Sequence, residues 1–192
     1  MWREHLMCET IVDGLHTEFS AILAYLEENN EVSWRSVVDN NFRKVVLMAA
    51  ASYFEQSMTN AVLNFVKQVT AENHPLTWLV NNKAICRQYH TWFDWEASNA
   101  NHFFGLFGDA FKKNMKEKIE NDDDLESSIK AFMEIGRERN RLVHQDFGNF
   151  PLEKTSEEIY RLYSMATLFV EQFPDALKMF SQEELEKKYQ AE

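Results

Sequence analysis

Three arginines and one histidine lie close together in the segment RERNRLVH, residues 137–144. An arginine side chain keeps its positive charge at physiological pH and can hold two oxygens of a phosphate group at once. An imidazole ring can accept and release a proton near neutral pH. Side chains of these two types, placed near one another, are suited to acid–base chemistry at a phosphate group.

Helical geometry decides which arginines could reach His144. At about 100° per residue, Asn140 and Arg141 lie one turn before His144, on its side of the helix. Arg137 lies two turns before it, close to the same face. Arg139 is offset by five residues. We therefore expect Arg139 to approach His144 only from the edge of that face or where the helix loosens.

A simpler interpretation of the same residues stays open. The segment lies near the predicted end of a helix, where the helix dipole favours positive side chains. The arginines could then form a solvated face without a chemical role, and an arginine five residues before a histidine is a common coincidence.

The elements that would position this segment are helices. Apolar residues recur at near-helical spacing over residues 2–28 and again over 42–70, and the second run is apolar enough to be buried on more than one side. Ser33 could cap a short helix between them. The step His74-Pro75 should end the long central helix, because the residue before a proline disfavours helical conformation.

Two further helices are expected over residues 76–93 and 101–119. Gly105 and Gly108 indicate a loop or a close helix contact within the second of them.

The last third of the chain carries clear capping signals. Asp122–Asp124 should cap the helix that ends in the arginine-rich segment. Thr155 with Glu158 fits a capping box that opens the next helix, which we expect to stop at Phe173-Pro174. Ser181 with Glu184 fits a second capping box, which opens an exposed helical tail over residues 181–192.

Composition agrees with a helical bundle. The 192 residues fit one domain, and 45% of them are hydrophobic. Only five glycines and three prolines are present, which disfavours a sheet with many tight turns. We predict an all-α bundle with long central helices, with helix in more than about half of the residues.

Charge and cysteine usage bear on partners and location. A formal net charge of -11 weighs against nonspecific binding of nucleic acid, although a local basic site remains possible. Cys8 and Cys86 stand far apart and indicate buried thiols in a reducing compartment. The first residues have no apolar signal region, and no stretch approaches the length that spans a bilayer. A cytoplasmic protein without membrane contact is expected.

Known cofactor and metal motifs do not match this sequence. It has no glycine-rich phosphate loop, no dinucleotide fingerprint and no serine nucleophile elbow. We therefore expect no metal site and no cofactor. Paired metal-ligand spacing is not found among the six histidines, which are His5, His16, His74, His90, His102 and His144.

Arg139-Asn140-x-x-x-His144 resembles the motif of the HEPN superfamily, in which an arginine, then a polar residue that is often asparagine, precede a histidine. Residues 51–55 (ASYFE) look like the aromatic-Glu segment of the branch called RiboL-PSP-HEPN. Residues 103–108 (FFGLFG) fall where such proteins often carry an aromatic-glycine stretch. The resemblance covers roughly residues 40–175.

The resemblance implies a single HEPN-type helical domain over residues 1–192. It also implies function, because HEPN enzymes are metal-independent endoribonucleases. His144 would move protons to and from the ribose 2′-OH and the 5′-oxygen leaving group, and Arg139 would stabilise the phosphorane. Asn140 could hydrogen-bond either of these two side chains. One protomer supplies one motif histidine, and in the family two protomers bring both motifs to one cleft, so a homodimer is expected.

Two features depart from the family pattern. Asp146 occupies a position where one toxin group of the family carries a tyrosine. Arg137 also stands at a gap from His144 that the motif allows, so Arg139 is chosen because Asn140 follows it. Arg137 and Arg141 are then interpreted as RNA-contacting or structural residues.

Other candidates lie outside the motif. Glu55 on the apolar central helix would be costly to bury unpaired, so we expect a partner such as one of the arginines, in a functional or a structural role. A basic patch could follow a phosphate backbone, although a solvated helix face explains it more simply; it comprises Lys112, Lys113 and Lys116. Trp34, Trp78, Trp92 and Trp95 are interpreted as core or interface anchors rather than base-stacking platforms.

Three hypotheses for the function follow from these interpretations. The first is an endoribonuclease acting as a toxin or an anti-phage defence effector, with RNA as its substrate and an antitoxin or a defence protein as a possible partner. The second is a non-catalytic HEPN module that binds RNA or a partner protein. The third is a helical adaptor whose arginines pair with acidic residues of its own bundle.

Overall fold

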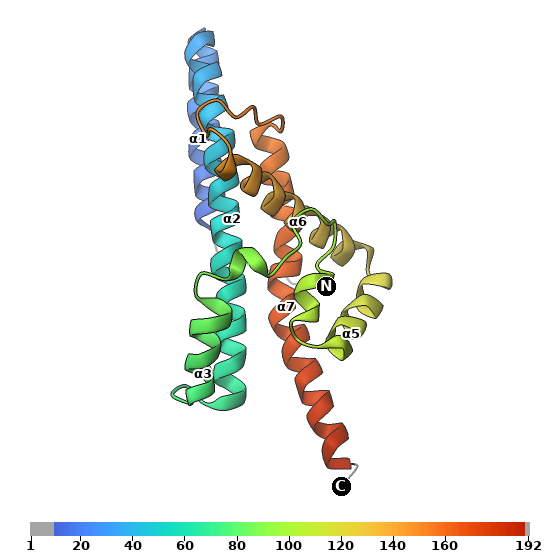
Figure 1. The fold of residues 1–192 in the computed structure, drawn as a ribbon. Coiled ribbons are helices and arrows are strands. Elements are labelled where there is room, and N and C mark those ends of the chain that lie inside the picture. Colours follow the sequence, from blue (N-terminus) through green and yellow to red (C-terminus); the bar gives the residue numbers. More distant parts are fainter. Residues whose placement is uncertain (1–9, 191–192) are drawn as a thin grey trace.

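The structure is a computed structural model that describes residues 10–190. Helices account for 80% of these residues and no strand occurs among them, which confirms the all-α prediction. Figure 1 shows the arrangement of the α-helices, which are α1 (Ile11–Glu28), α2 (Val32–Thr70), α3 (Pro75–Val80), α4 (Asn101–Gly105), α5 (Asp109–Glu120), α6 (Asp123–His144) and α7 (Ser156–Gln190).

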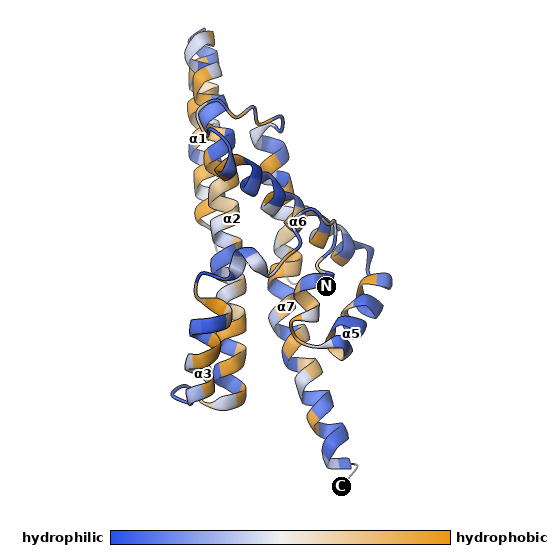
Figure 2. Ribbon diagram, in the orientation of Figure 1, coloured by the Kyte–Doolittle hydropathy of each residue, from blue (hydrophilic) through white to orange (hydrophobic). Residues whose placement is uncertain are grey.

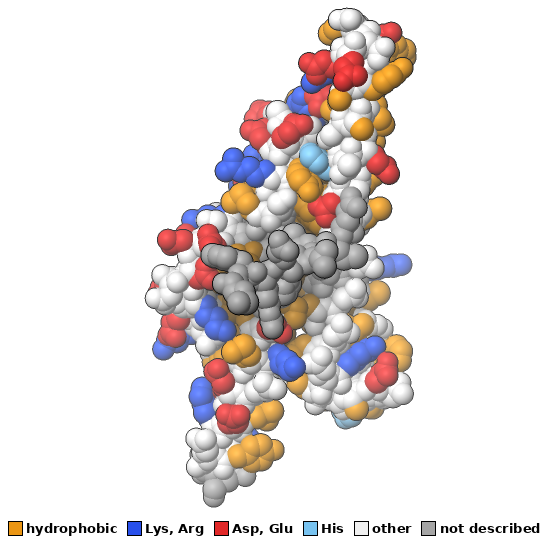
Figure 3. All heavy atoms as spheres, turned by 180° about the vertical axis from the view of Figure 1, so that it is seen from behind, with side chains coloured by type: hydrophobic (Ala, Val, Ile, Leu, Met, Phe, Trp, Pro, Cys, Tyr) orange, Lys and Arg blue, Asp and Glu red, His pale blue; other side chains and the backbone are white. Residues whose placement is uncertain are grey.

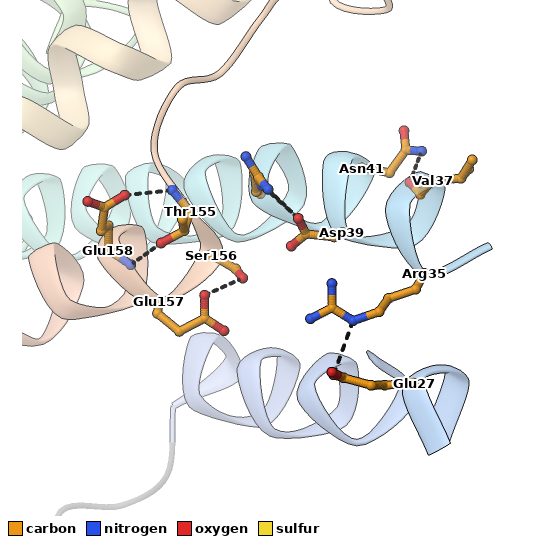
Figure 4. A network of polar contacts seen from close by, with 10 residues as sticks. Glu27, Arg35, Val37, Asp39, Asn41, Thr155, Ser156, Glu157 and Glu158 are labelled. Atoms are coloured by element: carbon orange, nitrogen blue, oxygen red, sulfur yellow. Dashed lines mark hydrogen bonds and ion pairs between the residues drawn. The ribbon is translucent and has the colours of Figure 1, made fainter. Parts of the chain in front are cut away.

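Helices α1 and α2 form an antiparallel hairpin (Figure 1). Arg35 Nε donates to Glu27 Oε2 over 3.3 Å and joins the two helices near their shared turn (Figure 4). The separate short helix expected after Ser33 does not form, because α2 runs through 39 residues without a break. Neither glycine nor proline occurs between residues 32 and 70, so nothing in the sequence interrupts this helix.

The His74-Pro75 step starts a helix rather than ending one. Helix α2 already ends at Thr70. His74 Nδ1 accepts a hydrogen bond from the backbone N–H of Leu76 over 3.2 Å, and Pro75 is the first residue of α3. Proline is favoured at this position because the N–H that it lacks would have no partner inside the helix.

Helices α6 and α7 complete the core by packing against α2 (Figure 1). Their contact is aromatic: the ring of Phe132 lies 5.4 Å from that of Phe54 and 5.2 Å from that of Phe169. Ser128 Oγ accepts a buried hydrogen bond from the backbone N–H of Phe169 over 2.8 Å. This bond joins the backbone of α7 to α6 and fixes how the two helices are aligned.

Both predicted caps around this pair of helices are present. Asp122 Oδ1 accepts from the backbone N–H of Leu125 over 2.9 Å and caps α6. Thr155 and Glu158 form the reciprocal bonds of a capping box, 3.1 Å and 2.8 Å long, at the start of α7 (Figure 4). The arginine-rich segment is therefore the last part of a helix with a defined start.

The prediction that the helix stops at Phe173-Pro174 was wrong, and so was the separate start at Ser181. Helix α7 continues through Pro174 to Gln190. A proline inside a helix costs on the order of 3 kcal/mol. Phe173 and Leu177, on either side of it, are buried in the core and offset that cost. The final turns are exposed and mainly hydrophilic (Figure 2).

The helix predicted over residues 76–93 was also wrong in its second half. A π-helical turn follows α3 over Asn81–Ile85, and only a short 3₁₀ turn, Tyr89–Thr91, interrupts the irregular chain up to α4. The backbone of Arg87 has φ of 60°, which no continuing right-handed helix can accommodate. The helix predicted over 101–119 is interrupted at Gly105–Gly108, where the glycines indicated a loop.

The surface carries charges of both signs. On the face shown in Figure 3, acidic and basic side chains are interspersed. Within residues 10–190, no helix is long and apolar enough to cross a membrane. Cys86 is exposed, so the prediction of a buried thiol was wrong there, and Cys8 lies outside the described residues.

Candidate functional site

The carboxyl-terminal half of α6 lines a cleft of about 560 Å³. The residues of α6 that line the cleft alternate at intervals of three and one along the helix, so they form a single stripe on its surface. Arg139, Asn140 and His144 all belong to that stripe, together with Phe132, Ile135, Gly136 and Val143.

The stripe is not centred on His144, and this separates the three arginines. Counting about 100° per residue, Gly136 and Val143 mark the middle of the cleft face, about 80° and 100° around the helix from His144. Arg139 lies beyond them on the same side, whereas Arg137 and Arg141 lie on the other side of His144. The cleft face of α6 is therefore rotated away from the His144 face that the sequence predicts, toward Arg139.

Arg137 and Arg141 are not among the residues that line the cleft. An oxygen of Glu134 lies 3.9 Å from Arg137 Nη2. Arg141 Nη1 donates to both carboxylate oxygens of the buried Glu138, over 2.9 Å and 3.1 Å. Its guanidinium also lies 5.5 Å from the centre of the Phe150 ring. Both arginines thus have acidic partners on their own helix, as expected for structural roles.

Arg139 has a different partner. Its Nη1 donates to Asn140 Oδ1 over 3.1 Å. Of the two partners expected for Asn140, the arginine is the one that it contacts. An amide oxygen orients the guanidinium without neutralising it, so the positive charge of Arg139 stays available to an anion in the cleft.

Helix α2 forms the second wall through Ala51, Phe54 and Glu55. The Glu55 side chain is half-buried, and within the described residues it forms no ion pair. The prediction that an arginine pairs with Glu55 was therefore wrong. The Glu55 side chain lines the open cleft, so its charge is not buried and needs no ion-pair partner. Burial, and then the negative charge of Glu55, raise the pKa of the Tyr89 hydroxyl above its ordinary range, while Arg139 lowers it. Glu55 and Arg139 thus act on the same side chain.

The third wall comes from the irregular segment after α3, and sequence reasoning missed it. Arg87, Tyr89, His90 and Trp95 line the cleft from this side. The segment RQYHTWFDW concentrates aromatic, basic and imidazole side chains, which was the available signal. Tyr89, Trp92 and Phe93 recur at a spacing that a helical face also produces, so the sequence predicts a helix here, whereas the structure buries the same rings from an irregular segment.

Trp95 lies directly against the backbone of α6. A Cβ atom at Gly136 would come within 1.9 Å of Trp95 Cζ3 and 2.2 Å of Cε3, so only glycine fits at this position. The indole Nε1 donates to the backbone oxygen of His90 over 3.0 Å. The Phe93 ring lies 4.8 Å away. These contacts fix the indole in place at the side of the cleft.

A buried lysine holds the chain just after His144. Lys44 on α2 is 2% exposed, and its Nζ donates to the backbone oxygens of Phe147 and Gly148 over 2.6 Å and 3.2 Å. The loop after α6 is thereby tied to α2. Sequence reasoning missed Lys44, although a lysine flanked by Phe42, Val45 and Val46 on an apolar helix was a visible signal.

The remaining sequence candidates lie elsewhere. Lys112, Lys113 and Lys116 are on α5, and none of them lines the cleft. Lys113 Nζ lies 3.8 Å from Glu117 Oε1. In the described part of the chain, no three His, Cys, Asp or Glu side chains are close enough together to hold a metal ion, and this includes the three that line the cleft.

A comparison with protein families decides the classification. The family model described as RiboL-PSP-HEPN matches residues 15–179. The chain belongs to the RiboL-PSP-HEPN family. The match starts earlier than the resemblance at roughly residue 40 suggested, and it takes in most of α1. HEPN domains are nuclease or RNA-related modules, which gives the cleft its general context. No match to a curated protein or to a solved structure is found.

The contact between Gly136 and Trp95 generates the first prediction for this HEPN chain. Gly136→Ala should displace the indole, and overpacking of this kind costs about 1–3 kcal/mol, more than the gain of about 1 kcal/mol in helix propensity. A lower free energy of unfolding and an altered near-UV circular dichroism spectrum are expected.

Gly14→Ala is the matched control, because a Cβ at this helical glycine would meet nothing within 4 Å. That variant should be stabilised by up to about 1 kcal/mol. In a Trp95→Ala background, Gly136→Ala should become stabilising too. Equal effects of Gly136→Ala in both backgrounds would show that the indole contact is unimportant.

Proposed function

We propose that this protein is a metal-independent endoribonuclease that cleaves RNA through attack of a ribose 2′-OH on the adjacent phosphate. One observation carries the proposal. Of the three arginines in the motif segment, only Arg139 faces the cleft, and it does so together with Asn140 and His144. These three are the residues through which the chain resembles HEPN ribonucleases.

The charges of the cleft support an anionic substrate. Although the chain has a net charge of -11, the cleft is lined by Arg87, Arg139, His90 and His144 with Glu55 as its acidic side chain. A positive site on an acidic protein attracts phosphate locally without promoting general binding to nucleic acid. Such a protein would act on a restricted set of RNA sites.

In the proposed reaction the 2′-oxygen forms a bond to phosphorus and the bond from phosphorus to the 5′-oxygen breaks. His144 moves a proton, from the attacking hydroxyl or to the departing 5′-oxygen. Arg139, oriented by Asn140, stabilises the negative charge of the phosphorane. The products are a 2′,3′-cyclic phosphate and a 5′-hydroxyl.

We further propose that the active form is a homodimer in which two motifs share one cleft, since one motif histidine supplies either the acid or the base. The rim beside His144 supports this. Phe147, three residues after His144, is 48% exposed and does not line the cleft, so part of an apolar ring stands in solvent next to the motif. A second copy packed there would cover it.

A role as a toxin or anti-phage effector, held in check by an antitoxin or a defence protein, is the biological context that we propose. It rests on what the HEPN resemblance implies and on the acidic charge of the chain, which suits a ribonuclease with a restricted target.

The chemical prediction concerns the motif. Purified protein should cleave RNA in the presence of EDTA, leave 2′,3′-cyclic phosphate ends and spare DNA, which lacks the 2′-OH. His144→Ala and Arg139→Ala should each lower the rate by on the order of a hundredfold or more, while circular dichroism stays unchanged.

Arg137→Ala is the control, because Arg137 is on the same helix but outside the cleft, and it should retain most of the activity. Cleavage by His144→Ala at the wild-type rate would reject the enzyme and favour a non-catalytic HEPN module that binds RNA or a partner protein.

The dimer is tested by sedimentation at micromolar concentration. Phe147→Glu should shift the protein toward monomers and reduce activity, because a charge would be buried at the interface. Leu185→Glu, on the exposed tail of α7, should do neither. A wild-type monomer with full ribonuclease activity would contradict the dimer.

The effector role is tested by expression in cells. Induction of the wild-type protein should arrest growth, Arg137→Ala should also arrest it, and His144→Ala should not. Growth that continues under wild-type expression, with active enzyme recovered from the same cells, would argue against a toxin.

A further inference from the structure

The cleft extends along α6 well beyond the motif. Trp95 contacts α6 at Gly136, which is one turn before Arg139 and two turns before His144. At 1.5 Å per residue these separations are about 5 Å and about 12 Å along the helix axis. An aromatic surface therefore lies beside the position where Arg139 would hold a phosphate.

The indole is built as a rigid surface. Its Nε1 is bonded to the His90 backbone oxygen, and its neighbours include Tyr89 at 5.8 Å and Phe93 at 4.8 Å between ring centres. Trp95 itself is only half-buried and lines the cleft, in contrast to the buried Trp92.

We propose that Trp95 is a stacking platform for an unpaired nucleobase, belonging to a nucleotide whose phosphate is bound by Arg139. This inference rests on the proposed function and deepens it by naming what the site recognises. The occupant is single-stranded or looped RNA, because bases inside a duplex already stack on their neighbours and cannot turn a face to the indole.

Polar side chains line the same cleft as the indole. Arg87 and His90 are exposed side chains of the same wall, and Glu55 faces them from α2. They offer hydrogen-bond donors and an acceptor to the edge of a stacked base, so this end of the cleft, rather than the motif, selects the nucleotide.

The test measures binding without cleavage. The probe is a short single-stranded RNA with 2′-O-methyl riboses, which cannot be cut, titrated against the full chain. Stacking of one base is worth about 1–3 kcal/mol, so Trp95→Leu should raise Kd by on the order of tenfold to a hundredfold. Trp95→Phe, which keeps an aromatic ring, should lose much less. Trp78→Leu, at an exposed tryptophan on α3, should bind like the wild type.

A second series keeps the test independent of how Trp95→Leu folds. Probes with a single abasic site at successive positions should reveal one position at which wild-type affinity falls, and Trp95→Leu should be insensitive there. Equal affinity for all probes, or no binding of the intact probe at millimolar concentration, would overturn the platform.

The platform and the proposed function can fail separately. If RNA is cleaved and yet no abasic position matters, the platform fails while the proposed function stands. If one position matters and His144→Ala cleaves normally, the platform stands and the proposed function fails.

Discussion

The cleft depends on the missing side chain at Gly136. Because no Cβ atom stands there, the Trp95 indole can lie on the backbone of α6 and bring the irregular segment after α3 against the helix that carries the motif. Without that close approach, α2 and α6 would still pack through Phe54 and Phe132, and the irregular segment would keep the ring contact of Phe93 with Phe132, at 5.0 Å. The indole, however, could not lie on the helix beside the cleft. Gly136 thus makes room for a contact between two parts of the chain that are far apart in sequence.

The motif could be predicted from sequence because its information is local. Arg139, Asn140 and His144 follow one another on one helix, and the structure places all three in one cleft. The cleft lies on a different face of that helix from the one that the spacing around His144 predicts. The positions of α2 and of Trp95 set that face, and neither is encoded in the motif itself. The choice of Arg139 over Arg137 rested on the adjacent asparagine, and the bond between them fits that choice.

The rest of the site was hidden because burial by tertiary contacts overrode local signals. The spacing of Tyr89, Trp92 and Phe93 predicts a helix, yet the chain buries the same rings from an irregular segment in which Arg87 adopts positive φ. Pro174 likewise predicts a helix end, yet buried neighbours carry α7 through it. The burial of Lys44 could not be predicted either, because its hydrogen-bond acceptors are backbone carbonyl groups in a loop about a hundred residues away.

The length of α2 has a mechanical consequence. Lys44, which holds the loop after His144, and Glu55, which forms the acidic side of the cleft, stand on the same unbroken helix. They are eleven residues apart, about three helical turns. No glycine or proline interrupts α2 between them, so a tilt of this part of the helix shifts both residues. Any force on the α1–α2 hairpin that tilts α2 will therefore move the anchored loop and the α2 wall of the cleft together.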